Sequence, residues 1–176
     1  MKPIYKLYLI TFLATGITYG LLMSLIEWAD GSRLSGWQII YRTSYFGLAM
    51  SLIIVSYHKY RLKKIGIREL TEENLGVSHN KILKSKLNIM ELIEELKKDP
   101  IFGKMKISEK ESEILIRSNL TWESWGEEIK IILNKHIADE YEYQVSSRPK
   151  FSLTLVDYGK NLENMMRIES VLINMV

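Results

Sequence analysis

Two long uncharged runs occupy the first third of the chain. Residues 7–26 contain no charged side chain, and residues 34–57 contain only Arg42. Because an α-helix rises about 1.5 Å per residue, about 20 apolar residues cross the hydrocarbon core of a bilayer. The pattern therefore predicts a hairpin of two transmembrane helices, at about 7–26 and 37–57. A cleaved signal peptide is disfavoured, because the first run exceeds the usual apolar region of about 7–15 residues and no small-x-small site follows it.

Beyond residue 86 the apolar positions follow shorter periods. Asn88 and Glu91 form a capping-box pattern ahead of an apolar stripe at helical spacing, and Asp99-Pro100 marks the end of that helix. Alternating positions then predict strands, and a final apolar stripe predicts a second helix. The expected strands are 104–107, 113–118, 127–133, 141–147 and 151–156, and the final stripe is Leu162, Met165, Ile168, Leu172 and Met175. The fold class is therefore a membrane α-helical hairpin plus an α+β domain, built as a helix, an antiparallel sheet of four or five strands and a helix.

Three segments follow from these patterns. They are a transmembrane hairpin, 1–57; a basic collar and linker, 58–85; and a cytoplasmic α+β domain, 86–176. Residues 69–85 show no clean period, so they are expected to connect the other two segments, with short helical pieces at most.

Lys and Arg residues near the predicted membrane ends set the orientation. Residues 58–68 carry five bases and no acid, Lys2 and Lys6 precede the first helix, and the loop 27–37 carries two acids and one base. By the positive-inside rule, both termini are expected in the cytoplasm of a two-pass protein of the bacterial inner membrane. The collar is also expected to contact anionic lipid head groups, through Lys59, Arg61, Lys63 and Lys64.

The net charge of +3 is unevenly distributed along the chain. Residues 1–69 hold nine bases and three acids, whereas residues 70–176 hold fifteen bases and eighteen acids. A nucleic-acid-binding domain is expected to carry its positive charge on the folded part. No nucleic acid partner is therefore predicted.

Residue types that support metal or catalytic chemistry do not occur in the required patterns. The chain has no Cys, and none of its three His has a second ligand at metal-binding spacing, so no metal and no cofactor are predicted. No nucleophile-elbow or phosphate-loop pattern surrounds the Ser, His and Asp residues, so no catalytic residue is assigned. These patterns favour a non-enzymatic protein.

Small side chains recur every four residues in both predicted transmembrane helices. The first helix has Gly16, Gly20 and Ser24, and the second has Thr43, Gly47 and Ser51. Such stripes let helix backbones approach closely in lipid. They indicate packing within the hairpin, or else self-association or docking to another membrane protein. Arg42 is expected to anchor near the outer interface, paired with Glu27 or Asp30.

Two segments of the α+β domain contain the candidate interaction or ligand residues. TWESWGEE places Trp122 and Trp125 in a loop, where they either cover one face of the sheet or contact a partner protein or the membrane interface. SSRPKFSLTLVDYGKN contains Arg148, Asp157, Lys160 and Asn161. Arg148 and Asp157 are expected to pair across this corner, with Asp157 or Asn161 capping the last helix. Alternatively, the helix N-terminus holds an anion together with Lys160 and Arg148.

Four stretches resemble bacterial membrane proteins that combine a two-helix hairpin with a small cytoplasmic domain. The stretches are FGLAMSL in the second span, KYRLKKIGI at its exit, TWESWGEEI, and SSRPK with DYGKNLENMMRI. The closing pattern of a strand, Ser-Arg and Asp-x-Gly-x-Asn is also similar to a small bacterial domain family of unknown function. Neither resemblance implies an activity, so no functional residue is carried over.

The sequence therefore favours a non-enzymatic accessory or scaffold protein of the bacterial inner membrane that presents a cytoplasmic interaction domain. Its expected partners are membrane lipids and either another membrane protein or a second copy of itself. Two alternatives stay open, a sensor that binds an anionic ligand or lipid head group, and an immunity-type membrane protein.

Overall fold

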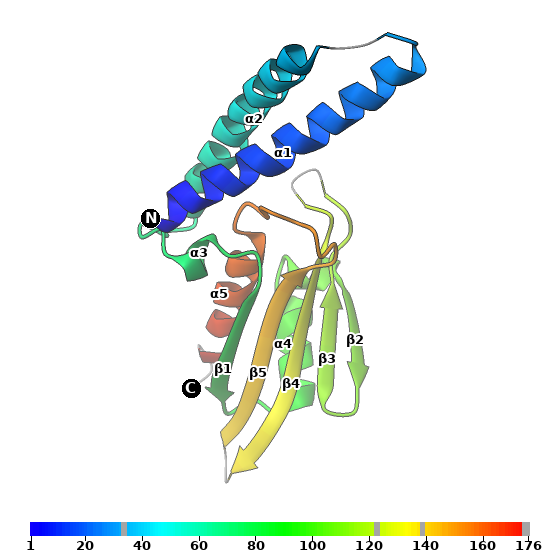
Figure 1. Ribbon diagram of the computed structural model, residues 1–176. Helices are drawn as coiled ribbons and strands as arrows, with labels where there is room; N and C mark the ends of the chain where they lie inside the picture. Colours follow the sequence, from blue (N-terminus) through cyan, green and yellow to red (C-terminus); the bar gives the residue numbers. More distant parts are fainter. Residues whose placement is uncertain (33–34, 122–123, 138–139, 174–176) are drawn as a thin grey trace. The chain divides into compact units, whose positions relative to one another are not determined.

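The computed structural model describes residues 1–32, 35–121, 124–137 and 140–173. The chain forms two compact units, residues 1–75 and 76–176. The elements, labelled in Figure 1, are α1 (Pro3–Ala29), α2 (Gly36–Lys64), α3 (Glu72–Leu75), β1 (His79–Ser85), α4 (Ile89–Lys98), the 3-10 helix η1 (Phe102–Lys104), β2 (Lys106–Lys110), β3 (Glu113–Arg117), β4 (Glu127–Ile137), β5 (Glu140–Pro149) and α5 (Lys160–Ile173).

The first unit contains the short α3 and a pair of helices, α1 and α2, each long and apolar enough to cross a membrane. Both are longer than the predicted spans, since α1 continues to Ala29 and α2 continues into the basic collar. The bases of the collar up to Lys64 form the last turns of α2, where positive side chains favour the negative end of the helix dipole.

Small residues bring α1 and α2 into close contact. A Cβ added at Gly16 would lie 2.8 Å from the carbonyl oxygen of Thr43, and one at Gly47 would lie 2.7 Å from the carbonyl oxygen of Phe12. Gly20 also packs against Thr43. The predicted packing within the hairpin is therefore confirmed for these positions.

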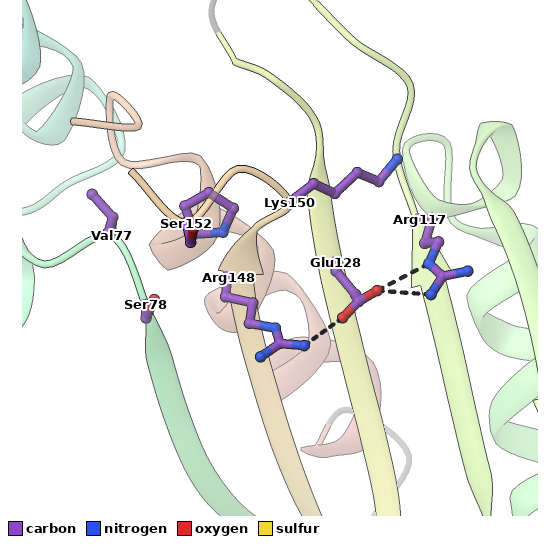
Figure 2. A pocket seen from close by; sticks show the side chains of 8 residues that line it. Val77, Ser78, Arg117, Glu128, Arg148, Lys150 and Ser152 are labelled. Atoms are coloured by element: carbon purple, nitrogen blue, oxygen red, sulfur yellow. Dashed lines mark hydrogen bonds and ion pairs between the residues drawn. The ribbon is translucent and has the colours of Figure 1, made fainter. Parts of the chain in front are cut away.

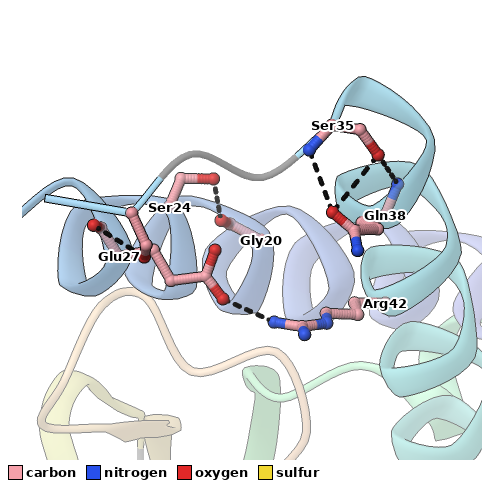
Figure 3. A network of polar contacts seen from close by, with 7 residues as sticks. Gly20, Ser24, Glu27, Ser35, Gln38 and Arg42 are labelled. Atoms are coloured by element: carbon pink, nitrogen blue, oxygen red, sulfur yellow. Dashed lines mark hydrogen bonds and ion pairs between the residues drawn. The ribbon is translucent and has the colours of Figure 1, made fainter. Parts of the chain in front are cut away.

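Polar groups of the hairpin find partners at the end where α1 leads into α2 (Figure 3). Arg42 Nη1 lies 2.6 Å from Glu27 Oε1, which confirms one of the two predicted pairings. Ser35 caps the start of α2 in a capping box. The hydroxyls of Ser24 and Ser51 donate to carbonyl oxygens within their own helices, so they add no bond between the helices.

The second unit is an antiparallel sheet with strand order β1-β5-β4-β3-β2 and with α4 and α5 on one face (Figure 1). Strand alternation points one set of side chains toward these helices. That set forms a core with the helices, which includes Leu92, Leu96, Phe102, Ile114, Ile116, Ile129, Ile131, Tyr143, Val145, Met165, Ile168 and Leu172. Among the described residues of this unit, no helix or strand covers the opposite face, which we call the open face.

Both predicted helices of this unit are present. Asn88 Oδ1 accepts hydrogen bonds from the backbone N–H groups of Met90 and Glu91, and the Glu91 carboxylate accepts one from the Asn88 N–H. The helix ends before Asp99, as the sequence indicates. In α5 the apolar stripe is buried at its four described positions, and residue 175 lies outside the described part of the chain.

The predicted strand at 151–156 is wrong. These residues form turns and bends, and Phe151, Leu153 and Leu155 are exposed. These residues cannot fold back onto β5 as a hairpin, because β5 ends at Pro149 and already lies between β1 and β4. The fifth strand is instead β1, within the segment expected to be a linker.

Candidate functional site

Four charged side chains form a row across the open face. Successive pairings align Lys106 of β2 with Arg117 of β3, Arg117 with Glu128 of β4, and Glu128 with Arg148 of β5. Residues aligned in this way share one face of a sheet. The row therefore places three cations beside a single carboxylate at one end of the open face.

Glu128 lies between the two arginines (Figure 2). Its Oε2 is 3.0 Å from Arg117 Nε and 2.9 Å from Arg117 Nη2, and its Oε1 is 2.8 Å from Arg148 Nη2. The hydrogen bond from Arg148, helped by Arg117, lowers the pKa of Glu128 from its ordinary value. Because this pKa is lower in the folded chain, the stabilisation is present at neutral pH and is lost as the pH falls through the lowered pKa.

A pocket of about 760 Å³ opens beside this bridge. It is lined by Val77, Ser78, Arg117, Glu128, Arg148, Pro149, Lys150 and Ser152, and we call it the basic pocket. Three cations and one carboxylate give it a net charge of +2. Planar guanidinium groups bind carboxylate and phosphate oxygens with two parallel hydrogen bonds, so the lining suits an anionic group.

The buried carboxylate of Glu127 joins the described ends of the loop between β3 and β4. The hydroxyls of Ser118 and Ser124 both donate to this carboxylate, and the Glu127 backbone N–H donates to the Ser118 hydroxyl over 2.7 Å. Lys150 Nζ donates to the Ser118 carbonyl oxygen, which joins this loop to the segment after β5. Gly126 has φ +87°, a conformation that favours glycine.

Large apolar side chains stand exposed on these two segments. They are Leu120, Trp125, Phe151, Leu153 and Leu155, and we call them the apolar tips. The rings of Trp125 and Phe151 lie 6.2 Å apart between centroids, and together with Lys150 they line a second hollow of about 310 Å³. The second hollow and the basic pocket therefore share Lys150.

The structure divides the predicted site residues between two places. Arg148 lines the basic pocket, and Trp125 belongs to the apolar tips rather than to a cover over the sheet. Lys160 begins α5 and does not line the basic pocket. Trp122 lies outside the described residues.

Asp157 and Asn161 form a buried cluster on the helix-covered side. Asp157 Oδ1 accepts from the Gly159 N–H at 3.0 Å, and Oδ2 accepts from the Asn161 N–H at 2.9 Å and from Asn161 Nδ2 at 2.8 Å. The hydroxyl of Ser147 donates to Asn161 Oδ1 at 2.8 Å. Asp157 thus caps the start of α5, whereas Asn161 lies within the helix.

The predicted Arg148–Asp157 pair is wrong. Consecutive strand residues point to opposite faces, so Ser147 faces α5 and Arg148 faces the open side. Arg148 bonds to Glu128, and Asp157 bonds to the backbone and side chain of the α5 N-terminus.

The sequence patterns did not single out Arg117, Glu128 or Lys150. The first two occupy outward positions of strands that were predicted, next to the inward Ile116 and Ile129. Charged residues at the outward positions of neighbouring strands were therefore the available signal, but only the strand register aligns them. No protein-family model, curated protein or solved structure matches this chain.

Proposed function

We propose that the protein is a membrane-anchored accessory protein that binds an anionic group rather than one that catalyses a reaction. In this proposal α1 and α2 cross a bacterial inner membrane, both termini are cytoplasmic, and the second unit presents the basic pocket to the cytosol. The anionic group is a carboxylate or phosphate, carried by a small ligand or by a partner protein.

The observation that supports binding most strongly is the arrangement of Arg117 and Arg148 around one carboxylate. A single Glu128 cannot satisfy two guanidinium groups, each of which offers five N–H donors. Side-chain exposure is 51% for Arg117 and 64% for Arg148, against 17% for Glu128. The ion pairs with Glu128 therefore hold both arginines in place, while further N–H donors of each guanidinium group stay accessible to solvent.

Membrane insertion is supported by the outward surface of the hairpin. Large apolar side chains are exposed along both helices, including Leu9, Ile17, Leu21, Leu25, Leu48, Leu52 and Ile53. A continuous apolar surface of this kind marks a contact with lipid or protein. The basic residues at the end of α2 support a cytoplasmic second unit by the positive-inside rule.

Arg148→Ala is expected to weaken binding of inorganic phosphate to the full-length protein in detergent about tenfold, because one charge-assisted hydrogen bond contributes at least about 1.5 kcal/mol. Glu128→Gln is expected to strengthen binding, because it removes the competing carboxylate and frees both guanidinium groups. Isothermal titration of each variant measures the dissociation constants.

Matched controls come from a second ion pair on the open face. Lys130 Nζ lies 2.9 Å from Glu113 Oε2, and neither residue lines the basic pocket. Lys130→Ala and Glu113→Gln make the same charge changes outside the pocket and should leave phosphate binding unchanged. Equal effects at both places, or no binding to the unmodified protein, would contradict a specific anion site.

A further inference from the structure

The apolar tips lie at the end of the sheet where the chain enters the second unit. β1 begins at His79, opposite Ser147, and Glu127 lies opposite Pro149. The loop before Glu127 and the segment after Pro149 therefore extend from the same end of the sheet as the start of β1. The turn between β2 and β3, at residues 111–112, lies at the other end.

The exposed apolar surface at this end is held in place rather than collapsed into the core. Leu153 is 74% exposed and Leu120 is 70% exposed, and neither belongs to the hydrophobic core of the unit. Glu127 accepts hydrogen bonds from Ser118 and Ser124 in one loop, and the Thr154 hydroxyl donates to the Phe151 carbonyl oxygen across the other at 2.7 Å. A fixed apolar surface binds without a large ordering cost.

Cations lie beside part of the apolar tips. Lys150 lines the same hollow as Trp125 and Phe151, and Arg117 and Arg148 line the adjoining basic pocket. Tryptophan is favoured at the membrane–water interface, and clustered Lys and Arg are attracted to anionic head groups. This combination of side chains matches an anionic bilayer surface.

The connection between α2 and β1 also favours a bilayer surface as the partner of the apolar tips. Residues 65–78 join Lys64 to β1, and a fully extended chain of that length reaches about 50 Å at most. If α2 spans a membrane, the entry end of the sheet is held at a high local concentration of lipid surface.

We infer that the apolar tips dock onto the anionic surface of the membrane that holds α1 and α2, with Lys150 contacting head groups. This inference rests on the anchoring part of the proposed function, but not on the ligand of the basic pocket. It assigns the exposed Trp125, Phe151 and Leu153 a role at the lipid interface.

The test uses the full-length protein in vesicles with a fluorophore on a single cysteine. The chain has no Cys, so Leu153→Cys reports on the apolar tips, and the exposed Ser112→Cys, at the opposite end of the sheet, is its control. Vesicles contain phosphatidylcholine alone or with about one quarter phosphatidylglycerol. Spin-labelled lipid quenches a fluorophore that reaches the bilayer.

We expect a blue-shifted, quenched fluorophore at position 153 in the anionic vesicles, a weaker effect in neutral vesicles, and no effect at position 112. A fluorophore at 153 that stays in water, while the protein floats with the vesicles, overturns docking and leaves anchoring intact. A blue shift that depends on the amount of protein per vesicle rather than on lipid charge overturns docking and indicates contact between copies of the protein. Protein that is washed from the vesicles overturns anchoring and docking together.

Discussion

Replacing Gly47 by leucine is expected to destabilise the α1–α2 hairpin by about 3 kcal/mol or more. A Cβ at this position would lie 2.7 Å from the Phe12 carbonyl oxygen and 3.1 Å from the Cα of Gly16. Both are backbone atoms of α1, so no side-chain rotation relieves the overlap and the helices must move apart. Overpacking of a close interface costs about 1–3 kcal/mol, and more where the backbone shifts.

The measurement is energy transfer between fluorophores on cysteines that replace Tyr5 and Tyr60 during a titration with SDS. Both tyrosines are exposed, and they lie near the end of the hairpin where the Tyr8 and Ser56 hydroxyls meet at 3.2 Å. Gly36→Leu is the control, because nothing lies within 4 Å of a Cβ added there. Equal midpoints for the two variants would show that the small residues do not hold the hairpin together.

Asp157→Ala should lower the free energy of unfolding of the second unit by about 3 kcal/mol or more. The Asp157 side chain is buried and accepts hydrogen bonds from Gly159 and from two donors of Asn161. Removing the carboxylate leaves all three donors buried and unsatisfied, and each such group costs about 1–3 kcal/mol. The start of α5 and its contact with Ser147 are expected to loosen together.

Chemical denaturation of the full-length protein in detergent, followed by pulse proteolysis, measures this loss. Glu109→Ala on the edge strand β2 is the control for removing an exposed acid and should have little effect. Arg148→Ala should cost less than about 1 kcal/mol, because the Arg148 side chain is mostly exposed and Glu128 keeps its ion pair with Arg117. If Arg148→Ala destabilised the unit as much as Asp157→Ala, the claim that the Asp157 hydrogen bonds hold the start of α5 in place would be wrong.

Elements whose signal is contained in their own residues were predictable from the sequence. The uncharged runs of α1 and α2 exceed the length of a bilayer core, and α4 carries its own start at Asn88, its apolar stripe and its stop at Asp99. The stripes of small residues also indicated close helix packing, and the structure shows that Gly16, Gly20 and Gly47 pack within the hairpin.

Strand identity was harder to predict because it depends on partners. Residues 151–156 alternate well but cannot fold back onto β5, because β1 and β4 already pair with both of its edges. In β1, Lys81 occupies a position on the helix-covered face, where it pairs with Glu169 of α5 at 2.8 Å, and Ile82 faces outward. Lys81 therefore occupies the position where an apolar residue would have continued the alternation that predicts a strand.

The net charge of residues 70–176 gives no sign of the basic pocket. Residues 70–176 carry more acids than bases, yet the row from Lys106 to Arg148 concentrates three cations at one end of the open face. That row exists only through the register of four strands. Of its members, the sequence singled out Arg148 alone, and it assigned that residue the wrong partner.

Membrane anchoring is tested most directly by cysteine accessibility in intact bacterial cells. Two single-cysteine variants are used, because the chain contains no Cys of its own. Ser32→Cys places the cysteine between α1 and α2, and Ser112→Cys places it in the second unit. A membrane-impermeant maleimide should label the cysteine at 32 in intact cells, and the cysteine at 112 only after the cells are lysed. Labelling of position 112 in intact cells, or recovery of the protein in the soluble fraction, would contradict a two-pass protein that presents its α+β unit to the cytosol.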